Sequence, residues 1–348
     1  MPNLLEWLRR LLNPRPPAAR PGILPGVPTS PPAGFPPDSP DEPAQILNRR
    51  VLLLVYDPVV EPASGRTLSQ LQNWYGAGDL VAGFSGDLLK VSRGLARYHI
   101  SERLELNEFP AKVDGFRYTA KTYLDVLGGA ATPHQPQEAD YGAVFDEHNI
   151  LARVASAAID EIWIIAFPHA GFHESTMGGP GAFWCNSPPL LDTDASRRRF
   201  VVMGFSSERK VGEMHEAFGH RFESTMMKAF SKLTGSANLW ERFIRYERSA
   251  PGLAACGNIH FAPNSERDYD WNNLTPVRSE CYDWLLNFPD FAGDVRTVTS
   301  SEWGSGDMRA HHTWWLNHVP RVAGRQHGIH NNWWQYVLDP DRVPGWRI

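Results

Sequence analysis

The chain has 348 residues, and the 42% that are hydrophobic are enough to bury a large core in one domain or two. Its formal net charge of −5 lacks the basic footprint of a nucleic-acid-binding protein, so we expect no nucleic-acid partner. Three cysteines cannot form a disulfide framework, which leaves either one bridge and one free thiol or three reduced thiols. Because the thiols do not pair off and no signal-peptide pattern is present, we expect a cytoplasmic rather than a secreted protein.

The first 44 residues predict two segments outside the folded core. Residues 1–12 form a short amphipathic segment with leucines on one face and arginines on the other. Its apolar run is too short for a transmembrane helix, but residues 4–12 suit weak docking to a membrane surface or a partner, unless the segment has no role. Residues 13–44 are rich in proline and predict a disordered tether. We expect residues 45–348 to fold as a single domain.

Strands and helices alternate along the folded region. Continuous or alternating apolar runs predict strands at 50–56, 98–109, 161–167 and 199–205. Helical spacing of apolar residues predicts helices at 67–75, 79–89, 118–127, 143–159 and about 211–233. This alternation predicts an α/β fold with a largely parallel sheet and flanking helices, followed by an irregular Trp-rich part over about 250–348. In such sheets, ligands bind beyond the carboxyl ends of the strands.

The helix after the last predicted strand carries the sequence His215-Glu216-Ala-Phe-Gly219-His220. Neutral imidazoles are favoured ligands of Zn²⁺, and a neighbouring glutamate can take a proton from zinc-bound water. The two histidines are five residues apart, which places them about 140° apart on a regular helix, too far for one ion. We therefore expect a π-bulge in this helix, at a place where Gly219 relaxes the backbone.

This motif resembles the His-Glu-x-x-Gly-His motif of the dipeptidyl peptidase III family of zinc exopeptidases. The resemblance implies that His215 and His220 bind zinc and that Glu216 activates water. It covers these six residues. The Glu-Glu-x-x-x-Glu type of segment that supplies the third ligand in that family has no counterpart here, since the nearest downstream pair, Glu241 and Glu247, is spaced differently.

The loop after the predicted strand at 161–167 is the second candidate region. Residues 168–186 contain two histidines, Glu174 and several glycines at a strand end, where binding loops are usually mounted. Glu174 is a candidate metal ligand, an anchor for a substrate amine, or a partner that orients a ligating imidazole. The alternative is a surface loop whose glycines only shape turns.

A catalytic zinc ion retains three protein ligands and leaves one position for water, so a third ligand is needed. We favour His260, 40 residues beyond His220, over Glu174, Glu223 and Glu247. Glu223 lies only three residues after His220, so it fits better as a carboxylate that orients a ligand.

The residue that polarises the substrate carbonyl is expected in the polar run around Asn264–Trp271 or in the C-terminal part. We favour Tyr269, with Arg267 and His318 as alternatives.

The sequence therefore predicts a zinc-dependent metallohydrolase that cleaves a peptide or related amide bond in a peptide or protein substrate. In this hypothesis Zn²⁺ is bound by His215, His220 and His260, Glu216 is the general base, and Tyr269 assists. One alternative is a metalloenzyme that uses the same histidine pair with carboxylates to hold iron or manganese.

Another alternative is a non-catalytic glycan- or peptide-binding module. Its binding wall would be the two tryptophan doublets at 314–315 and 333–334. The other interpretation of the first doublet is a packed helix. A second metal site formed by His311, His312 and His318 is the alternative that the sequence supports least.

Overall fold

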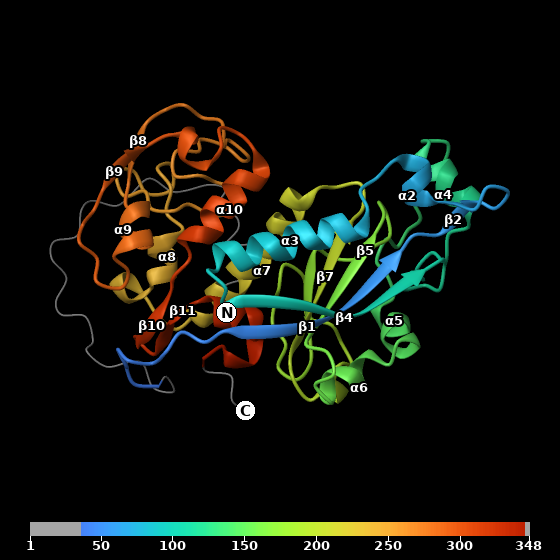
Figure 1. Cartoon of the computed structure of the whole chain (residues 1–348), viewed down its shortest axis with the longest axis horizontal. Coiled ribbons are helices and arrows are strands. Elements are labelled where there is room, and N and C mark those ends of the chain that lie inside the picture. Colours follow the sequence, from blue (N-terminus) through green and yellow to red (C-terminus); the bar gives the residue numbers. More distant parts are fainter. Residues whose placement is uncertain (1–35, 345–348) are drawn as a thin grey trace.

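The computed structural model describes residues 36–344 (Figure 1). The amphipathic segment 1–12 and most of the predicted tether lie outside these residues. The last residues of the predicted tether, 36–44, belong to the described part of the chain. Ser39 and Glu42 bond to the strand β10 (Arg321–Gln326), where the carboxylate of Glu42 pairs with Arg325 at 2.7 Å. Proline content alone does not reveal such a tertiary anchor.

A five-stranded sheet forms the centre of the first half of the chain, in the order β4-β1-β5-β7-β6. Its strands are β1 (Leu47–Tyr56), β4 (Ala96–Leu106), β5 (Glu161–Ala166), β6 (Ser175–Gly178) and β7 (Phe200–Ser206). The first four strands in this order are mutually parallel, and β6 joins the edge antiparallel to β7. The predicted parallel α/β sheet is confirmed. The strand β6, which lies in the predicted glycine-rich loop, was not predicted.

Burial explains why these strands read as apolar runs. All six residues of β5 and the last six of β1 are buried, as expected for central parallel strands covered on both faces. The edge strand β4 instead alternates, and its exposed positions carry charged side chains such as Arg97 and Glu102. Charges on an edge strand discourage pairing with another chain.

Helices cover both faces of the sheet (Figure 1). One face packs against α3 (Ala77–Val91) and α7 (Val211–Ala229). The other packs against α4 (Ala120–Leu127), α5 (Tyr141–Glu147) and α6 (Ile150–Ala155). The predicted helix at 143–159 is two helices, because Asn149 has a positive φ of 51° that breaks the helical path between them.

Smaller elements complete the sheet half of the molecule. These are α2 (Leu68–Gln72), β2 (Val59–Glu61), β3 (Arg66–Thr67) and the 3₁₀ helix η1 (Asp194–Ser196). The short helix α2 begins with a capping box formed by Thr67 and Gln70.

The Trp-rich part contains short helices and strands joined by long stretches without regular secondary structure, such as residues 244–276, in agreement with the predicted irregular part. These helices and strands are η2 (Gly235–Ala237), α8 (Leu239–Phe243), β8 (Val277–Ser279), α9 (Cys281–Leu286), β9 (Arg296–Val298), η3 (Ser300–Trp303), α10 (Met308–His318), β11 (Ile329–Asn332), α11 (Trp334–Leu338) and η4 (Pro340–Arg342). The strand β11 pairs antiparallel with β10. Helices α10 and α11 pack on α7, which therefore lies between the sheet and this part.

The tryptophan doublets belong to the core. Trp315, Trp333 and Trp334 are at most 1% exposed and pack edge-to-face against Phe222 and Phe243. One continuous hydrophobic core runs from the sheet through α7 into this cluster. Trp314 is the one member of the two doublets that is only partly buried.

Two other expectations can be compared with the described residues. Cys185, Cys256 and Cys281 are buried free thiols, as in the all-reduced alternative. Within residues 36–344, none of the helices combines the length and the apolar run that crossing a bilayer requires.

A buried ion pair joins three elements at the centre of the molecule. The guanidinium of Arg221 on α7 contacts both carboxylate oxygens of Glu161 on β5, at 2.5 and 3.0 Å. It also donates to the carbonyl of Val337 on α11 at 2.6 Å, and Trp163 donates its indole N–H to Glu161. Both charged side chains are 1% exposed.

We expect Arg221→Met to lower the free energy of unfolding by about 3–5 kcal/mol, because it leaves the carboxylate of Glu161 buried without a counter-charge. The matched control is Arg153→Met, which breaks a partly exposed pair with Glu102 and should cost less than about 1 kcal/mol. Urea unfolding measures both values. Equal losses in the two variants would contradict the central role of the Arg221 pair.

Candidate metal centre

Helix α7 presents one polar face along an otherwise buried length. It is a regular α-helix from Val211 to Ala229, so residues four apart lie next to each other on its surface. Gly212, Glu216 and His220 follow this spacing. The backbone N–H of Lys210 donates to the carboxylate of Glu213 at 3.1 Å, which caps the start of the helix.

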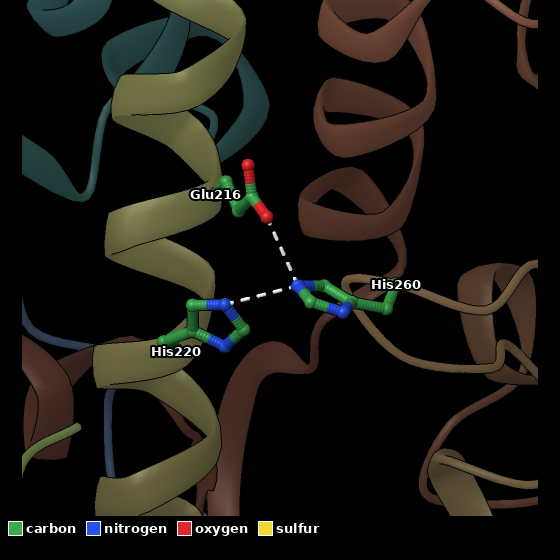
Figure 2. Close-up of side chains that lie close together, drawn as sticks. All are labelled: Glu216, His220 and His260. Carbon is green, nitrogen blue, oxygen red and sulfur yellow. Dashed lines mark hydrogen bonds and ion pairs between the residues drawn. The ribbon is translucent and has the colours of Figure 1, made fainter. Parts of the chain in front are cut away.

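Three side chains converge on this face (Figure 2). The Nε2 atoms of His220 and His260 are 3.1 Å apart, and Nε2 of His260 lies 3.0 Å from Oε1 of Glu216. One donor atom from each residue lies within 4.8 Å of the other two, so the group could hold a metal ion. His220 and His260 keep 19% and 24% of their side chains exposed, which leaves the group accessible.

His260 reaches α7 from the loop between α8 and β8. Its backbone N–H donates to the side-chain oxygen of Asn258, and the preceding N–H of Ile259 donates to Glu223 of α7 at 3.1 Å. The indole of Trp315 donates to the carbonyl of Gly257, which has a positive φ of 69° suited to glycine. These bonds fasten the loop between α7 and α10.

A carboxylate orients each imidazole. Nδ1 of His220 donates to Glu223 at 3.1 Å, and Nδ1 of His260 forms an ion-pair contact with Oδ1 of Asp268 at 2.9 Å. Both Nε2 atoms therefore face the centre of the group, as in many metal sites where a carboxylate fixes the ring of a ligating histidine. Burial lowers the pKa of both imidazoles, but bonds to Glu223 for His220 and to Glu216 for His260 outweigh it and raise each pKa.

Tyr269 covers the group from the solvent side. Its hydroxyl donates to Oε1 of Glu216 at 2.5 Å and lies 3.3 Å from Nε2 of His260. Burial opposes ionisation of Glu216, but the bonds from His260 and Tyr269 lower its pKa to about 2. Burial, and then the bond to Glu216, raise the pKa of Tyr269. The side chain is 45% exposed, so a molecule from solvent can reach it.

A cavity of about 220 Å³ lies at the carboxyl ends of β5 and β7, and its lining residues do not include Glu216, His220 or His260. Glu174, from the glycine-rich loop, and Ala217, next to Glu216 on α7, both line it. Oε2 of Glu174 accepts a bond from Asn186 at 2.9 Å, and its charge acts on the pKa of His220. The carboxyl edge of the sheet thus holds a cavity, and the loop after β5 forms one of its walls.

The structure does not bring His215 to this group. Because α7 has no π-bulge, His215 faces away from Glu216 and His220, toward α3, where it is fully buried. Its ring packs against Phe84, and its Nε2 lies 3.5 Å from Oδ2 of Asp87. The expectation that His215 and His220 bind one ion is therefore wrong, and so is the expected π-bulge. Glu216 occupies the place among the donors that the sequence analysis gave to His215.

The structural role of Gly219 also differs from the expected one. A Cβ atom at this position would overlap the side chain of Ile259. The glycine therefore allows the loop that carries His260 to approach α7 closely, rather than relaxing a bulge.

The remaining candidates divide clearly. Glu223 and Tyr269 lie at the group. Glu247 does not, because its carboxylate accepts a bond from the N–H of Gly252. The side chain of Arg267 is 81% exposed and points to solvent. His318 is buried against Trp314. His311 and His312 are buried too, and neither belongs to a cluster of potential ligands in the part of the chain that the structure describes.

Asp268, the carboxylate that contacts His260, was not among the predicted site residues. The only sequence signal was the density of polar residues around it. Comparison of the chain with protein-family models, with curated proteins and with solved structures finds no match.

We expect Gly219→Ala to weaken metal binding about tenfold and to lower stability by about 1–3 kcal/mol, because the added methyl group displaces Ile259 and with it His260. The control is Gly86→Ala on α3, where a Cβ meets nothing within 4 Å. The higher helix propensity of alanine should raise the free energy of unfolding of this variant by about 0.5–1 kcal/mol. Calorimetric titration with zinc and urea unfolding provide the two readouts. Unchanged zinc affinity in Gly219→Ala would show that the loop position does not govern the site.

Proposed function

We propose that the protein is a zinc-dependent hydrolase whose ion is held by Glu216, His220 and His260. The observation that supports this most directly is the convergence of two Nε2 atoms and one carboxylate oxygen at an accessible position. Three protein ligands leave a position for water or substrate, which distinguishes catalytic zinc sites from closed structural ones.

The donor set fits zinc. Two imidazoles and one carboxylate are a known ligand set of catalytic zinc. Two nitrogens bound at ~2.0–2.1 Å to one tetrahedral ion stand about 3.3 Å apart. The separation of 3.1 Å between the Nε2 atoms of His220 and His260 is close to this value. Glu223 and Asp268 supply the orienting carboxylates that such ligands normally have.

A bound zinc ion would supply a Lewis acid and an activated water. In this proposal Glu216 is a ligand rather than the general base expected from the sequence. The hydroxyl of Tyr269 donates to Glu216 in the free protein. With substrate bound, it would turn this hydrogen bond to the oxygen on which charge develops. Glu174, held through Oε2 by Asn186, accepts a proton or binds a substrate amine in the adjacent cavity.

We propose a peptide or related amide bond as the substrate. The cavity of about 220 Å³ at the carboxyl ends of β5 and β7 is bounded by the loop after β5, and in this proposal it receives a side chain of the substrate. Its position at the carboxyl edge of a parallel sheet is where such folds usually bind ligands.

A second candidate function follows from the same donor set. Two histidines and one carboxylate also hold Fe²⁺ in non-haem oxygenases, where the other positions stay open. An iron-dependent enzyme is therefore the rival of the zinc hydrolase. Metal analysis and the optical spectrum of the purified protein separate the two.

We expect purified protein to carry about one zinc per chain, and His220→Ala or His260→Ala to lose it, since either leaves only two ligands. His215→Gln should retain the metal, because His215 lies on the far side of α7. Mass spectrometry of metal content in the chelator-free proteins measures this. Retention in His220→Ala, or loss in a folded His215→Gln, would overturn the assignment.

We expect Tyr269→Phe to retain zinc but to reduce kcat about a hundredfold on a peptide cleaved by the wild type, with little change in KM. The control is Tyr282→Phe, which removes a similar bond from a tyrosine hydroxyl to Glu302 far from the site. A fluorogenic peptide library identifies the substrate, and steady-state kinetics compare the variants. Full activity in Tyr269→Phe would remove this residue from the mechanism.

A further inference from the structure

A buried imidazole lies against the face of α7 that carries Glu216 and His220, two of the three residues of the metal group (Glu216, His220 and His260). Nδ1 of His312, on α10, is 2.9 Å from the carbonyl oxygen of Gly212. Gly212 is one helical turn before Glu216 on the same face. Side chains of a helix lean toward its N-terminus, so Glu216 lies over the turn that begins at Gly212. His312 therefore approaches Glu216 from the buried side of the site.

Two further observations place His312 beside the group. The ring of Trp271 contacts both His312 and Tyr269, with centroid separations of 5.0 and 5.1 Å, and Tyr269 in turn bonds to Glu216. His312 and Glu216 also act on each other electrostatically. The imidazole thus forms part of the inner wall of the site.

The bond to Gly212 fixes the tautomer of His312. A carbonyl oxygen only accepts, so Nδ1 carries the hydrogen, and in a neutral ring Nε2 then presents a lone pair. Burial lowers the pKa of His312 to about 4, although the bond to Gly212 and the charge of Glu216 oppose this. The ring is therefore neutral near pH 7.

The lone pair on Nε2 has no donor within the described chain, residues 36–344, and the atom is buried. Ionised Glu216 can only accept, and the hydroxyl hydrogen of Tyr269 is already donated to Glu216. A buried acceptor without a donor costs about 1–3 kcal/mol. A donor from outside the chain would remove this cost.

His312 is not itself one of the candidate metal ligands. The three ligand atoms that lie within 4.8 Å of one another do not include a nitrogen of His312. We propose that Nε2 of His312 accepts a hydrogen bond from a water molecule bound at the metal group, and so holds that water beside Glu216. This inference rests on the proposed metal site, and it makes His312 a positioning residue.

Another histidine of α10 provides a matched control. Nδ1 of His318 donates to the carbonyl of Trp314 at 2.7 Å, and its Nε2 is likewise buried without a partner among the described residues. His318 packs against Trp314, away from the metal group. The two histidines therefore share tautomer and burial and differ in their distance from the site.

The test measures azide binding to the cobalt(II)-loaded protein by visible absorption. Azide displaces metal-bound water and has no hydrogen to donate to His312. In His312→Asn, the amide can still donate to Gly212, but no acceptor remains at the Nε2 position. We expect azide to bind roughly tenfold more tightly in this variant, because the displaced water has lost one hydrogen bond. His318→Asn should bind azide like the wild type, and all three proteins should bind one equivalent of cobalt.

Unchanged or weaker azide binding in His312→Asn would overturn the inference. Loss of cobalt in this variant alone would also overturn it, because His312 would then be a metal ligand. Circular dichroism checks folding. His312→Gln returns an oxygen acceptor near the Nε2 position and should bind azide like the wild type; affinity as high as in the Asn variant would contradict the role of the acceptor. Wild-type protein that binds no cobalt would overturn the proposed metal site itself, and this inference with it.

Discussion

The buried pair between Arg221 and Glu161 is the constraint on which the arrangement of the site depends. It connects α7 to the central strand β5 and to α11, and so fixes how α7 is rotated between the sheet and the Trp-rich part. Because His220 is the preceding residue, this rotation also fixes which residues of α7 face the loop that carries His260. A buried guanidinium without Glu161 would be unfavourable, so few other rotations of the helix are compatible with the fold.

The candidate metal group of Glu216, His220 and His260 joins two parts of the chain that are far apart in sequence. Glu216 and His220 come from the helix that packs on the sheet, whereas His260, Asp268 and Tyr269 come from the loop before β8. The close approach at Gly219 and the bond from Trp315 to Gly257 hold the loop in place. The Trp-rich core therefore has a structural role in the site, since it supports the loop that carries the candidate ligand His260 and the carboxylate of Asp268 beside it.

Much of the fold was predictable because its signals are local. The buried runs of β1, β5 and β7 are apolar on both faces, and that pattern identified a parallel sheet. The break at Asn149 and the edge strand β6 were missed, since each depends on a few residues without a strong periodic pattern. The sequence analysis also included His220 and His260 in one expected ligand set, together with His215, because a further ligand beyond the helix was needed.

By itself, the sequence determined that α7 is a helix rich in metal-binding groups, and helical geometry placed His215 and His220 about 140° apart. Only the tertiary structure decided between two outcomes: a bulge that unites the histidines, or a regular helix that separates them. Packing of His215 against Phe84 and α3 selects the regular helix. Glu216 then lies beside His220, because residues four apart share a face, and the rotation of that face is set by contacts that no local pattern contains.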